Sequence, residues 1–348
     1  MRPGTYGGTT ACLFPSLRFR TGSRRRGKKA EAFVTAEYLD DVLRDFSGYI
    51  AADELYDGPY CILSIVDNHQ FRRILYEVLD HKPMGADIER FFRRFKKALD
   101  DRGLRLRGIT TDGSVLYPAP LAVVFGGVKH QICQFHIIAD LTKAVLHALS
   151  VARKQLLAQV PKRGRGRPSA SQKLAVRHAK RIQEKAAELF EHRYLFVQHG
   201  LTPAEKRTLQ QITRGLPHLR ALREILDEVY RLFDRRCRSD TALAKLAKLR
   251  YRVRRFPAIG QTLRSLFSPN VEKALTFLDD SLLPSTSNAV ERANRRHRKM
   301  QKTAYRVRAE HNIRRRIALD LLREAGLAWK HQTTNLLHTV RRGAGNVL

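Results

Sequence analysis

Strand patterns in this sequence are confined to one stretch, between Tyr49 and Ile137. The runs YIAADELY, PYCILSIVDN and RRILYEVLD, with turn residues such as Asp57-Gly58 between them, predict three consecutive strands joined by tight turns. The later runs GITTDGS and VKHQICQFHI predict a fourth and a fifth strand. All strands of the fold must therefore come from this one part of the chain.

Two helical segments lie among these predicted strands. In ADIERFFRRFKKALDDRG, apolar residues recur at helical spacing and Gly103 closes the segment; they are Ile88, Phe91, Phe92, Phe95 and Leu99. LYPAPLAVVFGG predicts a second, short helix. The resulting order, β-β-β-α-β-α-β, indicates the α/β class, with a mixed sheet and flanking helices.

Helical patterns fill the chain from Asp140 to about Leu283 and predict an all-α insertion that interrupts the α/β domain. We therefore expect four parts. They are a flexible basic arm (1–35), the first part of the α/β core (36–139), the helical insertion with a basic linker (140–283), and a C-terminal core helix with a basic tail (284–348).

Positive charge dominates the composition, with 66 Lys and Arg against 33 Asp and Glu and a formal net charge of +33. A large polyanion is the expected partner, with nucleic acid favoured over a ribosome-associated or membrane-surface role. No apolar run approaches the roughly 20 residues of a membrane span, and the patch Ala11–Phe14 is too short for a secretory signal. Four scattered cysteines fit reduced thiols in the cytosol.

Two aspartates stand among apolar residues on predicted central strands: Asp53 in YIAADELY and Asp112 in GITTDGS. An isolated carboxylate there is costly unless it meets a cation or a hydrogen-bond network, and a metal ion would supply that compensation. The alternative for Asp112 is an ordinary strand-to-turn exit, in which its side chain accepts backbone hydrogen bonds. Spacing alone does not decide between the two.

A third acid, Glu291, lies far along the chain in PSTSNAVERANRRHR. With Asn288 it can form a capping box, and with Arg295 a surface ion pair. However, Glu291 is the only acid between Asp280 and Glu310, and Arg295, Arg298 and Lys302 extend its helical stripe. A carboxylate at the head of a basic track fits a metal site that receives a nucleic-acid backbone, with these three cations as DNA-binding residues.

Two other acids compete with Asp53. Glu54 is adjacent, but alternation along a strand points it to the opposite face. Asp67, followed by Asn68, is better explained as a turn former between the second and third strands. Asp53 is therefore preferred as the first acid.

The core RGRP of PKRGRGRPSA matches the AT-hook pattern, in which Arg165 and Arg167 would enter a narrow A·T minor groove. A flexible basic linker between insertion helices explains the same residues equally well. We keep both interpretations open.

Taken together, the motifs resemble a known family. AADELY, ITTDGS followed by YPAPL, HQICQFH, the long helical block and STSNAVERANRRHRK are similar to the DDE transposases of bacterial insertion sequences. The resemblance is to the group related to eukaryotic Mutator-like elements and covers about residues 49–320. It implies a ribonuclease H-like catalytic domain with an all-α insertion between the second Asp and the Glu. Asp53, Asp112 and Glu291 would be the catalytic and metal-binding acids.

The family's Cys-x-x-His signature falls on Cys133 and His136. The spacing is that of half a zinc site, but no second ligand pair accompanies it in the sequence. A non-metal role near the active site is therefore favoured over zinc, and a buried structural pair is the alternative.

The resemblance also implies the chemistry and the partners. Carboxylate ligands suit two Mg²⁺ ions, or Mn²⁺ as a substitute, for DNA strand cleavage at transposon ends and strand transfer into target DNA. The expected partners are double-stranded DNA, namely the terminal inverted repeats and the target, and a second copy in a homodimer. No membrane is involved, and the expected location is the bacterial cytoplasm, at the nucleoid.

Such enzymes normally carry a dedicated N-terminal DNA-binding domain, and the residues before Tyr49 show neither a helix-turn-helix nor a zinc-finger pattern. The sequence is therefore also compatible with an N-terminally truncated copy. Two alternative functions stay open: a transposase-derived DNA-binding protein without catalysis, and a ribonuclease H-like nuclease that cleaves but never joins strands.

Overall fold

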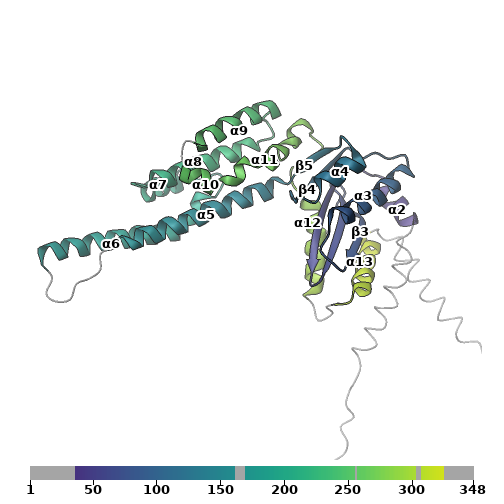
Figure 1. Cartoon of the computed structure of the whole chain (residues 1–348), viewed down its shortest axis with the longest axis horizontal. Coiled ribbons are helices and arrows are strands. Elements are labelled where there is room, and N and C mark those ends of the chain that lie inside the picture. The colour runs from purple at the N-terminus through teal and green to yellow at the C-terminus, as the bar shows by residue number, and fades with distance from the viewer. Residues whose placement is uncertain (1–35, 161–168, 255–256, 303–306, 325–348) are drawn as a thin grey trace, which may run out of the picture. The chain divides into compact units, whose positions relative to one another are not determined.

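The computed structural model describes residues 36–160, 169–254, 257–302 and 307–324. The predicted α/β class is confirmed. Five strands form one mixed sheet in the order β3-β2-β1-β4-β5, with helices beside it (Figure 1). The strands are β1 (Tyr49–Asp57), β2 (Tyr60–Asp67), β3 (Arg73–Leu79), β4 (Gly108–Thr111) and β5 (Lys129–Ile132).

The first three strands form the predicted antiparallel meander. Asp53 of β1 pairs with Ser64 of β2, and β2 pairs in turn with β3. The turn after β2 depends on Asp67, whose Oδ1 accepts hydrogen bonds from the backbone N–H groups of His69 and Gln70 at 2.8 and 2.9 Å. The interpretation of Asp67 as a turn former is therefore confirmed.

The helix predicted from its aromatic stripe is α3 (Gly85–Asp100), and the short helix is α4 (Pro118–Phe125). The predicted apolar residues of α3 are all buried. Its Phe92 and Phe95 rings lie 5.8 and 6.2 Å from the ring of Phe125. The two helices thus pack through the face that the sequence pattern indicated.

The fifth strand is shorter than predicted. It ends at Ile132, and Cys133 precedes the first residue of α5 (Gln134–Ala158), so the strand prediction over QFHI was wrong. Short apolar runs do not distinguish a strand from the start of a buried helix. Here the helical spacing of the buried residues Leu141, Val145 and Leu149 continues the run as a helix.

From α5 to α12 the described elements are helices. They are α5, α6 (Ala170–Glu191), η1 (Arg193–Phe196), α7 (Pro203–Ile212), α8 (Pro217–Leu232), α9 (Ser239–Arg254), α10 (Pro257–Thr262), η2 (Arg264–Phe267), α11 (Pro269–Lys273), η3 (Thr276–Asp279) and α12 (Asn288–Gln301). The remaining helices are α2 (Ala36–Leu43) at the start and α13 (Glu310–Glu324) at the end.

One described helix, α5, is long and apolar enough to cross a membrane by length and composition alone. A core helix of a soluble protein passes the same test. α5 contacts α6, α8, α10 and α11, and 28% of its most apolar window is buried.

The chain divides into two compact units, each described here by itself. Unit 1 contains the described parts of Met1–Arg107, Leu116–Gly127 and Asn288–Leu348, and unit 2 contains Gly108–Val115 and the described parts of Val128–Ser287. The short strands β4 and β5 thus group with the helices. One reason is that the buried Gln131 side chain of β5 donates to the Ala274 carbonyl and accepts from the Phe277 N–H, both at 2.8 Å.

Three predictions fall on parts of the chain outside the described residues. They are the basic N-terminal arm, the AT-hook arginines Arg165 and Arg167, and the basic tail beyond residue 324.

Candidate functional site

In unit 1, helix α12 packs on β1 and β2. Its buried residues Ala289, Val290 and Ala293 form an apolar cluster with Ala51 of β1 and Val66 of β2. Small side chains on both sides allow the helix and the strands to approach closely. The helix that carries Glu291 therefore does return to the strand that carries Asp53.

A hydrogen bond joins the two elements at the predicted acid. The Nδ2 of Asn294 donates to Oδ2 of Asp53 at 2.7 Å, and the backbone N–H of Glu54 donates to Oδ1 at 2.9 Å. Asn294 is 1% exposed, and its Oδ1 is a buried acceptor without a partner among the described residues. Both oxygens of Asp53 are thus oriented by N–H donors, as a carboxylate acting as a fixed ligand requires.

Glu291 lies one helical turn before Asn294 and is half-buried. Residues three apart on a helix lie on the same side, so Glu291 and Asn294 share the side of α12 that meets β1. The helix begins at Asn288 itself, whereas an N-cap residue stands one position before the first helical residue. This start disfavours the capping-box interpretation.

A second polar contact fixes α12 further along the strand. The Nε2 of His297 lies 2.9 Å from Oδ2 of Asp57, and Gln301 donates to the same oxygen. His297 is 2% exposed, and burial lowers its pKa despite the neighbouring Asp57. Asn294, His297 and Gln301 therefore anchor one face of α12 to β1 at Asp53 and Asp57.

Glu54 is closer to Asp53 than expected. Burial raises the pKa of the Cys61 thiol to about 12, and the charges of Glu54 and Asp53 add to the rise. Carboxylate oxygens of Glu54 and Asp53 lie within 4.8 Å of each other. Strand alternation therefore did not separate the two acids in space. Glu54 thus remains a competitor for the metal.

In unit 2, Asp112 directly follows β4. Its Oδ1 accepts a hydrogen bond from the Ser114 N–H at 2.8 Å, which is the turn contact expected of a strand exit. Gly113 has a φ of +98°, and a Cβ at this position would lie 3.1 Å from Ile132 and 3.2 Å from Asn270. The turn that positions Asp112 therefore requires glycine at its second residue.

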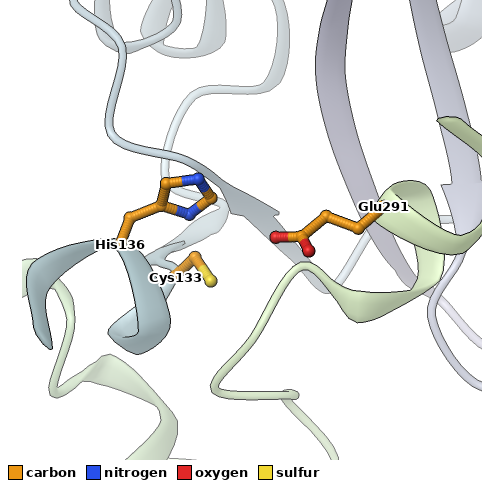
Figure 2. Close-up of side chains that lie close together, drawn as sticks. All are labelled: Cys133, His136 and Glu291. Atoms are coloured by element: carbon orange, nitrogen blue, oxygen red, sulfur yellow. The ribbon is translucent and has the colours of Figure 1, made fainter. Parts of the chain in front are cut away.

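Cys133 and His136 lie at the start of α5 in unit 2, and Figure 2 shows their side chains there, as well as Glu291 on α12. The Cys133 sulfur accepts a hydrogen bond from the Ser287 N–H at 3.3 Å and lies within 4.8 Å of a His136 ring nitrogen. Burial alone would raise the Cys133 pKa, but hydrogen bonds from His136 and Ser287 lower it. A buried cysteine and a half-buried histidine are thus connected at the start of α5.

Cys133 is also next to Asp112 within the same unit. β4 and β5 are parallel, Thr111 pairs with Ile132, and the Cys133 N–H donates to the Thr111 carbonyl at 2.8 Å. Because parallel strands end at the same edge, the carboxylate of Asp112 and the Cys133–His136 pair follow neighbouring strand ends.

The predicted basic stripe lies on the side of α12 opposite Ala289 and Ala293, next to Asn294, and Glu291 is at its start. Arg295, Arg298 and Lys302 are all exposed, and none has an ion-pair partner among the described residues. Their charges are therefore available to a ligand.

Of the predicted acids, Asp53 and Glu291 lie in unit 1 and Asp112 lies in unit 2. Sequence reasoning missed Asn294, His297, Gln301 and Asp57. The signal was present in NAVERANRRHRKMQ, where an Asn, a His and a Gln at positions 294, 297 and 301 recur at helical spacing on the same side as the alanines. No protein-family model matches the chain, and no curated protein sequence matches it.

Proposed function

We propose that this protein is a DDE transposase, which cleaves DNA strands at transposon ends and transfers them into target DNA with divalent metal ions. The observation that carries the proposal is the hydrogen bond from Asn294 to Asp53. It brings the helix of Glu291 against the strand of Asp53, which is the arrangement that the family resemblance requires.

The order of the elements gives further support. β4 ends just before Asp112, and Asp53 lies within β1. The antiparallel meander followed by a helix and two more strands also fits a ribonuclease H-like domain. The helices α5 to η3 would then be the all-α insertion, placed between the second Asp and the Glu.

The donor set fits hard divalent cations. Asp53, Asp112 and Glu291 supply only carboxylate oxygens, and each is half-buried rather than fully exposed. The partnerless Oδ1 of Asn294 adds an oxygen that water or a cation could satisfy. Two Mg²⁺ ions, or Mn²⁺, would when bound assist attack on the phosphodiester and stabilise the leaving oxygen.

The residues named above have separate roles in the proposed reaction. Asp53, Asp112 and Glu291 hold the cations, and Asn294 fixes the orientation of the Asp53 carboxylate. Arg295, Arg298 and Lys302 bind backbone phosphates of double-stranded DNA, the transposon end or the target. Two ends must be joined in one complex, so a homodimer acting at the nucleoid in the bacterial cytoplasm is part of the proposal.

The test measures Mg²⁺-dependent nicking of plasmid DNA and joining of a labelled duplex with a pre-cut 3′ end. Asp53→Asn, Asp112→Asn and Glu291→Gln should each lower nicking and joining by at least about 100-fold, because each removes a ligand charge. EDTA should abolish both activities. Asp100→Asn is the matched control, since Asp100 forms only an exposed ion pair with Lys96.

Circular dichroism of each variant shows whether the fold is kept. Full nicking by any folded acid variant would refute the assignment of that acid. DNA binding without nicking, unaffected by EDTA, would instead identify a non-catalytic DNA-binding protein. Nicking without joining would identify a nuclease. Glu54→Gln should retain activity, and its loss would move the first ligand from Asp53 to Glu54.

A further inference from the structure

We propose that unit 2 carries a stacking surface for unpaired nucleic-acid bases, formed by the rings of Phe190 and Tyr194 with Arg193 and Arg153. We call these four residues the aromatic platform. Phe190 is in the last turn of α6, Arg193 and Tyr194 are in η1, and Arg153 is on α5.

Both rings are exposed to solvent. Phe190 is 50% and Tyr194 is 57% exposed, whereas Phe196, two residues after Tyr194, is completely buried. The local fold thus buries one aromatic residue of the segment and leaves two outside. Exposed aromatic rings that lie together commonly mark a binding surface.

Two arginine side chains lie against these rings. The guanidinium carbon of Arg193 lies 4.3 Å from the Phe190 ring centroid and 4.5 Å from that of Tyr194. Arg193 also donates to the Phe190 carbonyl at 2.6 Å, which fixes its position. Arg153 adds a second guanidinium 4.9 Å from the Phe190 centroid. The rings are therefore held in place and surrounded by positive charge.

Helix termination explains part of this arrangement. A cation that binds the last carbonyls of α6 stabilises the helix end, and Arg193 does so. That role needs no aromatic residue, and it does not account for two exposed rings that both contact Arg193. Packing against another protein would account for the rings, but not for two arginines among them on a chain with a net charge of +33.

An unpaired nucleotide satisfies both requirements. Its base has a flat apolar face that stacks on Phe or Tyr, and its phosphate is attracted by nearby arginines. Stacking is tolerant of base identity, so the platform would bind single strands, or bases displaced from a duplex, without reading sequence. This activity needs no metal and no catalytic acid, so it goes beyond the proposed cleavage and joining.

The experiment uses the full chain in EDTA with a single-stranded oligonucleotide that contains 2-aminopurine, whose fluorescence falls on stacking. A duplex of the same sequence is measured in parallel by anisotropy. The double variant Phe190→Ala, Tyr194→Ala should bind the single strand at least about 10-fold more weakly and lose the quenching. Its salt dependence should stay unchanged, because no phosphate contact is removed.

Two further variants make the result specific. Phe190→Leu with Tyr194→Leu keeps apolar side chains but removes the rings, and it should lose affinity and quenching as the alanine variant does. Tyr251→Ala on α9 removes a ring that is 68% exposed in the same unit, and it should bind as the wild type does.

Three results would overturn the proposal: no single-strand binding by the wild type, full affinity of the leucine variant, or an equal loss with Tyr251→Ala. Because EDTA is present throughout, these results are independent of nicking. If the predicted single-strand binding is not found while duplex binding persists, the aromatic-platform proposal is refuted and the transposase proposal is unaffected.

Discussion

Asn294 contributes more to the candidate site than its neutral side chain suggested. Its amide must present the NH₂ group to Asp53, since an amide oxygen would be repelled by the carboxylate. This leaves the Oδ1 acceptor directed elsewhere and without a described partner. A buried polar atom of this kind costs free energy unless a ligand or water satisfies it, which is typical of functional sites.

His130 on β5 makes a testable contribution to stability at acidic pH. Its Nε2 lies 2.9 Å from the Thr111 hydroxyl, and burial lowers its pKa to about 4. The unfolded chain binds a proton at this residue below about pH 6.5, whereas the folded chain does so only near pH 4. Protonation therefore favours unfolding, and stability falls as the pH decreases through this window.

We expect the wild type to lose on the order of 3 kcal/mol more stability between pH 6.5 and pH 4 than His130→Gln does. Glutamine keeps an amide group near Thr111 but does not titrate. Urea unfolding followed by circular dichroism at several pH values measures the difference. The contributions of all other titrating groups to the pH dependence cancel, because both proteins contain these groups. Parallel pH profiles of the two proteins would show that His130 is not the buried neutral group described here.

At the scale of the element, α12 has two faces with separate tasks. One face packs small apolar residues on β1 and β2 and places Asn294 and His297 on Asp53 and Asp57. The other face exposes Arg295, Arg298 and Lys302. A single helix can thus position an acid next to β1 and present cations to a DNA backbone.

Neutralising the exposed stripe should weaken duplex binding without unfolding the protein. In the triple variant Arg295→Gln, Arg298→Gln, Lys302→Gln, the slope of log affinity against log salt concentration should become shallower by up to about 2.7. The reason is that three phosphate contacts are lost, so fewer counterions are released on binding. Fluorescence anisotropy from 50 to 200 mM salt would measure it. The control replaces three scattered exposed lysines, Lys97, Lys206 and Lys248, by Gln.

The control makes the same change in net charge, so an equal decrease in slope for both triple variants would show a diffuse charge effect. If the slope of the stripe variant stays at the wild-type value, Arg295, Arg298 and Lys302 do not contact DNA phosphates.

At the scale of the whole molecule, the two units have separate cores. Leu246 of α9 is 1% exposed within unit 2, and Val66 of β2 is completely buried within unit 1. Leu246→Ala should cost about 2–5 kcal/mol through the cavity it leaves. Hydrogen exchange should then accelerate in the helices of unit 2, while the amides of β1 and β2 keep their wild-type protection.

Val66→Ala is the matched variant and should accelerate exchange in β1 and β2 with little effect on α8 and α9. Equal acceleration of both units by either variant would show that they unfold as one cooperative body rather than two.

Secondary structure was predicted correctly from the sequence where the spacing of apolar residues fits only a helix or only a strand. The aromatic stripe from Ile88 to Leu99 gave α3 correctly, and the meander followed from alternation and turn residues. The end of β5 could not be placed, because an apolar run at Cys133 fits a strand and a helix start equally well. The short distance between the carboxylates of Asp53 and Glu54 was also not predicted, because strand alternation describes the faces of side chains and not the positions of their ends.

The sequence identified the candidate acids but not the residues that contact them. Asp53 and Glu291 were found as carboxylates in unexpected surroundings, whereas Asn294, His297 and Gln301 look like ordinary polar helix residues in the sequence. Their role appears only when α12 is placed on β1. The hydrogen bond between Asn294 and Asp53 joins residues that are 241 positions apart in the sequence. Local patterns do not contain that information.

The sequence distance between Asp53 and Asn294 also means that β1 is synthesised well before α12. A ribosome adding about 5–20 residues per second releases β1 roughly 12–50 seconds before α12. Throughout that interval the nascent chain carries an Asp53 carboxylate that Asn294 does not yet orient. A product that stops before Asn288 never acquires that partner or Glu291. A chain of this design therefore gains the residue that orients Asp53 only after 241 more residues have been added.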